Sequence, residues 1–201
     1  MGTLDYYNKN AKSYFDKTKK TDMDKQYEMF LKYVQPGGKI LDFGCGSGRD
    51  SLRFHELGYK VYPIDGSIEM CKLAHQYTNL PVKCMDFSEL SDIDYYDGIW
   101  ACSTLLHVPR KDLLGILIKL RDALKQEGCL YASFSSGFDR EVYKEDGRYF
   151  NDLSEERFTT ISNDAGLRIV EFDNNKSRVL EHKDVYWDSY ILKRKWYGTS
   201  I

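Results

Sequence analysis

Short apolar runs alternate with amphipathic stretches along most of this chain. Runs typical of buried strands occupy 40–43, 59–64, 81–84 and 96–101. Apolar residues then recur at helical spacing, behind a polar start, over 51–57, 67–77 and 111–126. Strands and helices that alternate in this order predict a parallel sheet with right-handed crossovers.

The helix expected over 111–126 has the clearest periodicity. Its apolar stripe consists of Leu113, Leu114, Leu117, Leu120 and Leu124. Gly128 is expected to end this helix, and 129–134 to form a fifth strand. Residues 135–151, rich in glycine, aspartate and aromatic residues, are expected to form a loop.

The remaining chain predicts one more helix and two more strands. Ser154, with two glutamates behind it, is typical of a helix start, and Gly166 of its end. Strands are expected over 167–172 and 185–193, joined by a polar connection.

The N-terminal region has two parts. Asp22 predicts the N-cap of a helix whose apolar face runs from Met23 to Val34. Residues 1–21 lack clean periodicity and carry aromatic residues that include Tyr14. They are open to two interpretations, an unstructured tail or a flap whose aromatics cover a ligand pocket. We expect one domain over 1–201, with 1–21 as an N-terminal flap and 22–201 as the core.

Composition narrows the function classes. A net charge of −2 over 201 residues gives no electrostatic case for nucleic acid or an anionic membrane. No apolar run approaches the ~18 residues of a membrane span, and no signal peptide is visible. The five cysteines are scattered without a C-x-x-C pair, which argues against a metal site or a disulfide framework. A cytoplasmic location is therefore expected.

A glycine-rich turn, within the sequence ILDFGCGSGRDS, follows the first strand. Glycines occupy positions 44, 46 and 48, and a helix begins at once, which is typical of a nucleotide cradle. The dinucleotide fingerprint G-x-G-x-x-G requires glycine at position 49, where this chain has Arg49. Asp42 precedes the turn, and an acid at the rim suits a ligand with a cationic amino group. These residues resemble motif I of the class I S-adenosylmethionine-dependent methyltransferases.

Acids follow the next two expected strands. Asp65 lies 21 positions after Gly44, close to the ~20 expected of an acid that binds ribose hydroxyls. In the family that the chain resembles, residues just after this acid pack on adenine, which assigns Met70 that role; core packing is the alternative. Asp86 is the residue expected to accept from the adenine amino group, with the aromatic ring of Phe87 beside it. The alternative is an N-cap for the short turn over 88–90.

The fourth strand and its continuation, YDGIWACSTLLHV, resemble motif IV of the same family. The resemblance implies a Rossmann-like α/β fold with a seven-stranded, mostly parallel sheet, helices on both faces and an antiparallel last strand inserted in the sheet. It implies S-adenosylmethionine as cofactor, with S-adenosylhomocysteine as product. The expected cofactor-binding residues are Asp42, Gly44, Cys45, Gly46, Gly48, Arg49, Asp65, Gly66, Ser67, Met70, Asp86, Phe87, Ala101, Cys102, Ser103 and Tyr14.

The acceptor side is less defined. His107 is the best candidate for a general base, because its unperturbed pKa is near neutrality; a capping or packing role is the alternative. Tyr14, Tyr143, Arg148 and Tyr149 are candidates to shape or close the acceptor pocket, with a surface position as the alternative for each. The stretches GCGSGRDS, LLHV and DGRYF are similar to small-molecule methyltransferases of the tellurite-resistance and ubiquinone-biosynthesis groups. The sequence leaves the acceptor and the oligomeric state open.

Other functions compete with methyl transfer to a small molecule. A nicotinamide dinucleotide oxidoreductase or redox-sensing domain is one, although Arg49 and Asp42 count against it. A non-catalytic cofactor-binding module of the same fold is another. A DNA amino-methyltransferase is disfavoured, because the family's Asn/Asp-Pro-Pro-aromatic run is replaced here by ACSTLL. An acid pair typical of protein arginine methylation is also missing after the fourth strand.

Overall fold

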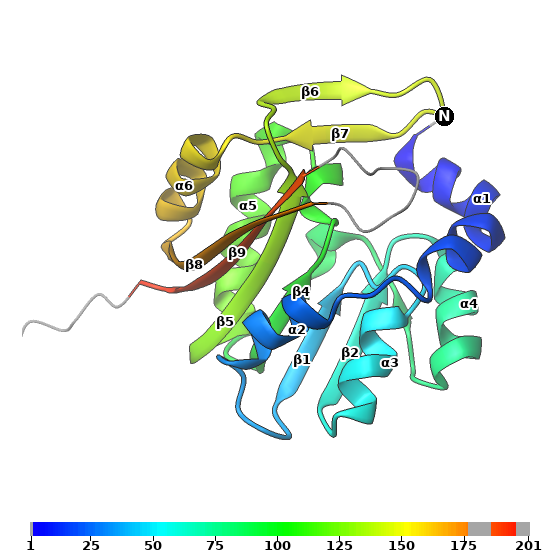
Figure 1. The fold of residues 1–201 in the computed structure, drawn as a ribbon, viewed down its shortest axis with the longest axis horizontal. Coiled ribbons are helices and arrows are strands. Elements are labelled where there is room, and N and C mark those ends of the chain that lie inside the picture. The colour runs from blue at the N-terminus through cyan, green and yellow to red at the C-terminus, as the bar shows by residue number, and fades with distance from the viewer. Residues whose placement is uncertain (1, 177–185, 196–201) are drawn as a thin grey trace, which may run out of the picture.

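A computed structural model describes residues 2–176 and 186–195 of the chain (Figure 1). Seven strands form the main sheet in the order β3-β2-β1-β4-β5-β9-β8. Their bounds are β1 Lys39–Phe43, β2 Lys60–Asp65, β3 Lys83–Cys84, β4 Tyr96–Ala101, β5 Leu124–Ser135, β8 Leu167–Lys176 and β9 Tyr186–Arg194. The pairs among β1 to β5 are parallel, whereas β9 is antiparallel to both β5 and β8. This confirms the mostly parallel seven-stranded sheet with an inserted antiparallel last strand. Residue 185, where that strand was expected to begin, lies outside the described residues.

Helices cover both faces of the sheet. Their bounds are α1 Thr3–Thr18, α2 Asp24–Leu31, α3 Arg49–Glu56, α4 Ile68–Thr78, α5 Arg110–Ala123 and α6 Glu155–Asp164, with the 3-10 turns Phe87–Glu89 and Leu105–His107. The expected N-caps of α4 and α6 are confirmed, because Ser67 accepts from the Met70 N–H and Ser154 from the Arg157 N–H. The short strand β3 covers only the second half of the expected 81–84 run.

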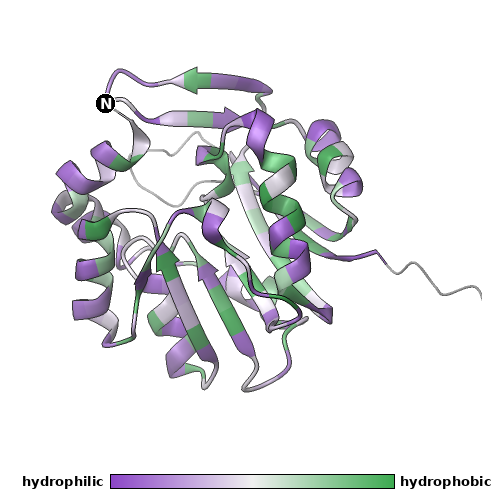
Figure 2. Cartoon of the chain, turned by 180° about the vertical axis from the view of Figure 1, so that it is seen from behind, coloured by the Kyte–Doolittle hydropathy of each residue, from purple (hydrophilic) through white to green (hydrophobic). Residues whose placement is uncertain are grey.

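The core lies in a layer on each side of the sheet. On one side, Phe30 of α2 and Phe54 of α3 pack on Trp100 of β4. On the other, α5 and α6 pack on the sheet, with Phe158 against Phe134 of β5. Figure 2 shows the apolar residues concentrated in the strands and the polar ones on the outer surfaces of the helices. Within residues 2–176 and 186–195, no helix is long and apolar enough to cross a membrane.

The helix expected over 111–126 ends earlier, at Ala123, so the prediction that Gly128 ends it was wrong. Leu124 pairs with Tyr96 in the sheet and begins β5, and the register shifts before the next pair, Gly98 with Cys129. Backbone bonds from Asp94 and Tyr95 to the last carbonyls of α5 also favour the early end. Pairing with β4 therefore outweighs the helical periodicity that Leu124 continues.

The expected loop over 135–151 contains a β-hairpin instead. Its strands are β6 Arg140–Tyr143 and β7 Tyr149–Asp152, which pair antiparallel as a separate two-stranded sheet. The hairpin lies above the edge at which the parallel strands end, and its turn approaches α1 (Figure 1). The Tyr149 N–H donates to Thr3 Oγ1 at 2.9 Å, which ties the hairpin to the first turn of α1.

Most of the region expected as a tail or flap is the four-turn helix α1. Ala11 and Phe15 are its buried residues, and they pack with Met70 of α4. The apolar contact between α1 and α4 is therefore narrow. The partly buried Tyr7 and Tyr14 lie beside it, at the sheet edge. The structure excludes the unstructured alternative for residues 3–18, whereas the role of a flap stays a prediction.

Candidate active site

The glycine loop after β1 has one position at which a Cβ would meet no close neighbour. A Cβ on Gly44 would lie 2.5 Å from Thr104, and one on Gly48 would lie 2.7 Å from Thr78. A Cβ on Gly46 would meet nothing closer than the Tyr14 ring at 3.8 Å. All three have positive φ, a conformation that favours glycine. Close packing thus explains Gly44 and Gly48, and Gly46 is the position that a ligand can approach.

Asp65, the last residue of β2, holds the two loops that surround this position. Its Oδ2 accepts from the Gly46 N–H at 2.9 Å and its Oδ1 from the Ser67 N–H at 2.8 Å. Burial raises the pKa of Asp65, and the backbone donors oppose that rise. Each carboxylate oxygen has further lone pairs. The carboxylate is therefore fixed in direction while it keeps capacity to accept from a ligand.

Asp42 and Arg49 lie beneath the loop. Asp42 is 1% exposed and accepts from Ser51 Oγ at 2.5 Å. Burial and the nearby charge of Asp50 raise the pKa of Asp42 to about 8. The Arg49 guanidinium donates twice to Asp50, at 2.7 and 2.8 Å, and once to the Thr18 carbonyl at 3.5 Å. Both side chains are engaged within the protein, so their expected contact with the cofactor stays a prediction.

Two tyrosines of α1 lie over the sheet edge. The rings of Tyr7 and Tyr14 meet edge to face with their centroids 5.0 Å apart. Tyr14 faces Gly46, and Leu4 lies against Gly66, 2.9 Å from where a Cβ would be. Asn8 Oδ1 accepts from Ser67 Oγ at 2.7 Å. The helix therefore touches residues of both loops expected to bind the cofactor, Gly46 in one and Gly66 and Ser67 in the other.

His107 closes the acceptor side. Its Nδ1 lies 2.8 Å from the Tyr149 carbonyl oxygen, and its Nε2 lies 2.8 Å from the Tyr7 hydroxyl. A carbonyl only accepts, so Nδ1 carries the proton and Nε2 accepts from Tyr7. Burial lowers the pKa of His107 to about 4 and raises that of Tyr7. The imidazole is neutral, and the lone pair of Nε2 is directed at the Tyr7 hydroxyl.

The residues expected at the adenine differ in their surroundings. Asp86 is exposed, and its Oδ1 accepts from both the N–H and the hydroxyl of Ser88. It therefore caps the turn that follows, as in the alternative interpretation. The Phe87 ring packs on Phe43 with centroids 4.3 Å apart. Met70 is buried between α1 and α4, which is the packing alternative rather than an open surface for a base.

The end of β4 lies beside the glycine loop, because β1 and β4 are neighbours in the sheet. Ala101 is fully buried, and the half-buried Cys102 and Ser103 follow it. Ser103 has φ +53°, and its N–H donates to Ser133 Oγ at 2.8 Å. Burial raises the pKa of Cys102 to about 11 and also raises that of Cys45 in the glycine loop. Both thiols therefore stay protonated.

The acceptor-side candidates differ in their surroundings. Tyr143 is 78% exposed, and its ring packs on Tyr149 with centroids 5.1 Å apart. Arg148 stacks on the Tyr6 ring at 4.3 Å and pairs with Asp146, so it holds the hairpin turn against α1, and its charge acts to lower the pKa of both Tyr7 and His107. Thr104 and Ser133 support the loops and were missed, since a single hydroxyl after a strand carries no signal of its own. Across residues 2–176 and 186–195, no cluster of three His, Cys, Asp or Glu side chains could hold a metal ion.

Comparison with known proteins identifies the class. Residues 40–128, from β1 into β5, match a family model described as a methyltransferase domain. This range includes the glycine loop, Asp65, Asp86 and His107. Residues 40–128 therefore form a methyltransferase domain, and the findings support the class I S-adenosylmethionine-dependent type. The oxidoreductase alternative is not favoured.

Relatives of this methyltransferase are recognisable but distant. An uncharacterized methyltransferase of Staphylococcus carnosus is 25% identical over 88% of this chain and 96% of its own length. A ubiquinone biosynthesis O-methyltransferase of Xanthomonas campestris is 31% identical over 49% of this chain. The match covers 43% of the length of the Xanthomonas protein, so it is confined to one part of that protein.

The fold of the methyltransferase also has solved counterparts. A 1,6-didemethyltoxoflavin-N1-methyltransferase of Burkholderia thailandensis, solved with its substrate and S-adenosylhomocysteine, superimposes with a TM-score of 0.78. The two are 18% identical, and the match covers 96% of this chain and 85% of that one. At such identity the likeness shows the fold alone.

Proposed function

We propose that this chain transfers the methyl group of S-adenosylmethionine to a nucleophilic atom of a small molecule. The arrangement of Asp65 carries the proposal. Its carboxylate is held by two backbone N–H groups at the sheet edge, next to Gly46, the loop glycine at which a Cβ would meet nothing closer than the Tyr14 ring at 3.8 Å. A fixed carboxylate suits a pair of ribose hydroxyls, and bare backbone suits a close approach by the amino-acid part of the cofactor. The residues present therefore fit the cofactor.

The remaining cofactor contacts follow from the order of the strands. Asp86 and Phe87, after β3, are the residues that face adenine in this proposal. Ala101 to Ser103, after β4, line the methionine end. Tyr14 covers the glycine loop from above. In open α/β sheets, ligands bind beyond the carboxyl ends of the strands, and these residues all lie at that edge.

When bound, S-adenosylmethionine would supply a methyl group attached to a sulfonium sulfur. The thioether S-adenosylhomocysteine would be the leaving group. The protein's tasks are to align the acceptor and to exclude water. The tyrosines of α1 and the hairpin cover the edge of the sheet and exclude water. His107 holds the acceptor, because an acceptor hydroxyl or amine that displaces Tyr7 can donate to its neutral Nε2, which can then take the proton.

The acceptor is small in this proposal. The cover formed by α1 and the hairpin lies directly over His107, which leaves little room for a polymer. The net charge of −2 gives nucleic acid no attraction. The five cysteines, all within the described residues, are free thiols, which supports a reducing compartment such as the cytoplasm.

Isothermal titration of S-adenosylmethionine against the wild type and an Asp65→Asn variant tests the proposal. The variant should bind about 1–3 kcal/mol more weakly, the range for losing charged hydrogen bonds. Asp164→Asn, at an exposed acid near the end of α6, is the matched control and should bind as the wild type does. Equal affinity of all three proteins would contradict the ribose assignment.

Turnover needs a second measurement. Release of S-adenosylhomocysteine should be followed with panels of small phenols, thiols and amines as acceptors. Product with any of them supports the proposed acceptor class. Cofactor binding without turnover on any panel, together with turnover on RNA or on a protein, would contradict the proposed small-molecule acceptor.

A further inference from the structure

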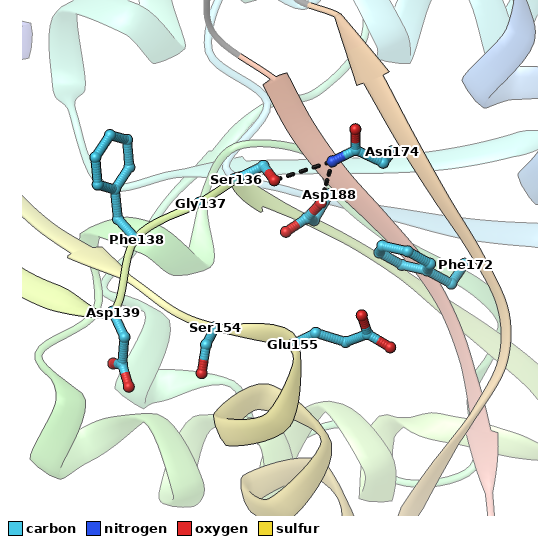
Figure 3. A pocket seen from close by; sticks show the side chains of 9 residues that line it. All are labelled: Ser136, Gly137, Phe138, Asp139, Ser154, Glu155, Phe172, Asn174 and Asp188. Carbon is cyan, nitrogen blue, oxygen red and sulfur yellow. Dashed lines mark hydrogen bonds between the residues drawn. The ribbon is translucent and has the colours of Figure 1, made fainter.

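A hollow of about 560 Å³ opens near the carboxyl end of β5, away from the residues assigned to the cofactor (Figure 3). It lies between the segment after β5, the start of α6 and strands β8 and β9. Ser136, Glu155, Phe172, Asn174 and Asp188 are among its lining residues. None of the residues proposed for cofactor binding lines it.

Carboxylates supply the charge of this hollow, and no lysine or arginine is among its lining residues. One of them, Asp139, is neutralised by Arg110 at 2.9 Å and Arg157 at 2.7 Å. Glu155 forms no ion pair or hydrogen bond through its side chain with the side chains that the structure describes, those of 2–174 and 186–195. Asp188 accepts one hydrogen bond, at 2.6 Å, from the amide of Asn174. Among these described side chains, Glu155 and Asp188 are therefore the carboxylates of the hollow that have no cationic partner.

Asp188 is buried, and its carboxylate has a single neutral donor beside it. The residue is 6% exposed, and a carboxylate removed from water normally has several donors or a cation beside it. The only donor to it among the described residues is a neutral amide, which also donates to Ser136 Oγ at 2.9 Å. Figure 3 shows the Asp188 carboxylate directed toward the same open space as that of Glu155. The hollow thus contains a buried negative charge that a cationic ligand can compensate.

An aromatic wall stands beside these two acids. Phe172 is 42% exposed, and its ring packs on Tyr190 with centroids 5.1 Å apart. Tyr190 is 1% exposed, and its hydroxyl has no hydrogen-bond partner among the described residues. An exposed phenyl face next to carboxylates is typical of sites for organic cations. A metal ion fits less well, because the described residues contain no cluster with enough ligating groups.

We propose that this hollow binds the ammonium group of an organic cation, with Glu155 and Asp188 as counter-ions and Phe172 as the aromatic face. The proposal is independent of methyl transfer, because it concerns residues that the cofactor site does not use. A quaternary ammonium fits the chemistry well, since it needs charge and an aromatic surface but no hydrogen-bond acceptor of fixed direction.

Protein-observed NMR titration of the full chain with choline tests the proposal, with 3,3-dimethylbutan-1-ol as the neutral isostere. Choline should bind saturably, with shifts centred on Ser136, Asn174 and Phe172, and about tenfold more tightly than the isostere. Equal binding of both probes would show a merely apolar hollow and overturn the proposal. Absence of choline binding would overturn it as well, and so would Mg²⁺ that saturates the same residues as tightly as choline does.

Variants distinguish choline binding in this hollow from a general effect of surface charge. Glu155→Gln and Phe172→Leu should each weaken choline binding by about fivefold or more. Glu156→Gln is the matched control, because Glu156 is an exposed acid in the same first turn of α6 but does not line the hollow. Equal loss in the Glu155 and Glu156 variants would reduce the effect to long-range charge and contradict the site. Thermal unfolding of each variant shows that the fold is retained, and an unchanged affinity for S-adenosylmethionine separates this result from the proposed function.

Discussion

His107 illustrates how the surroundings of one residue change its chemistry. A histidine in water has a pKa near neutrality, whereas burial lowers the pKa of His107 to about 4. The carbonyl of Tyr149 fixes its tautomer, and Nε2 faces Tyr7. The residue is therefore unprotonated throughout the physiological pH range, and it needs no deprotonation near pH 6.5 to free Nε2.

His107→Ala should lower kcat by about 10²-fold, the lower range for general acid–base catalysis, and leave the affinity for S-adenosylmethionine nearly unchanged. The wild-type rate should stay flat from pH 8 down to about 5, because the pKa of His107 lies below that window. Steady-state kinetics across this range checks both points. A wild-type rate that falls with a midpoint near pH 6.5, or a variant with full activity, is incompatible with the proposed role.

Asp42 provides a second test at the level of one side chain. Its pKa is about 8 in the folded chain and about 3.9 in an unfolded one, so between these values the unfolded state releases a proton that the folded state retains. The free energy of unfolding of the wild type should therefore fall as pH rises from 5 to 8. Asp42→Asn, which cannot ionise, should gain about 1 kcal/mol per pH unit relative to the wild type. Urea unfolding at several pH values measures the difference, and parallel curves would mean that Asp42 is ionised in the folded protein.

Spacing predicts the positions of site residues better than the directions of their side chains. The distance from Gly44 to Asp65 follows from one strand–helix–strand unit, so the two were correctly expected at one edge. The contact of Arg49 with the cofactor stays a prediction, and in the structure its guanidinium is bound by Asp50 and the Thr18 carbonyl. Asp50 also accepts from Tyr27 and Trp100, which come from distant parts of the chain. Such a network depends on tertiary structure and leaves no trace in local sequence.

Among the elements, α1 shows why periodicity alone can fail. A helix whose buried residues are Ala11 and Phe15 alone has no continuous apolar stripe, and two of its tyrosines, Tyr7 and Tyr14, lie next to His107 and Gly46. The 111–126 prediction failed for the opposite reason. Leu124 continues the apolar stripe from Leu120, but its place in the sheet opposite Tyr96 decides its conformation. Tertiary contacts decide both cases.

Phe15→Ala should detach α1 from α4 and leave the sheet intact. Phe15 is buried against Met70 and meets the Tyr77 ring, so its loss removes most of the apolar contact of the helix. Hydrogen exchange should show lost protection within 3–18 alone, and stopped-flow release of S-adenosylmethionine should accelerate by about tenfold or more. The control is Lys9→Ala, at an exposed position of the same helix. If cofactor release is unchanged although α1 exchanges freely, the helix does not cover the cofactor.

For the whole molecule, stability rests on the two layers beside the sheet and function on its edge. Phe30→Ala removes a fully buried ring that packs on Phe54 and Trp100, and should lower the free energy of unfolding by about 3–5 kcal/mol. Ile93→Ala, at a residue that is 65% exposed, should change it by less than about 0.5 kcal/mol. Urea unfolding measures both. A small effect of Phe30→Ala would contradict a tightly packed layer under α2.

The inserted position of β9 has a consequence for biosynthesis. The strand β8 is made before β9, yet it has no partner in the sheet until β9 lies between it and β5. While the ribosome translates the intervening segment, β8 presents unpaired backbone donors and acceptors. A nascent chain that stalls before residue 194 therefore exposes an unpaired, aggregation-prone strand. We expect chaperones to bind the nascent chain at that stage.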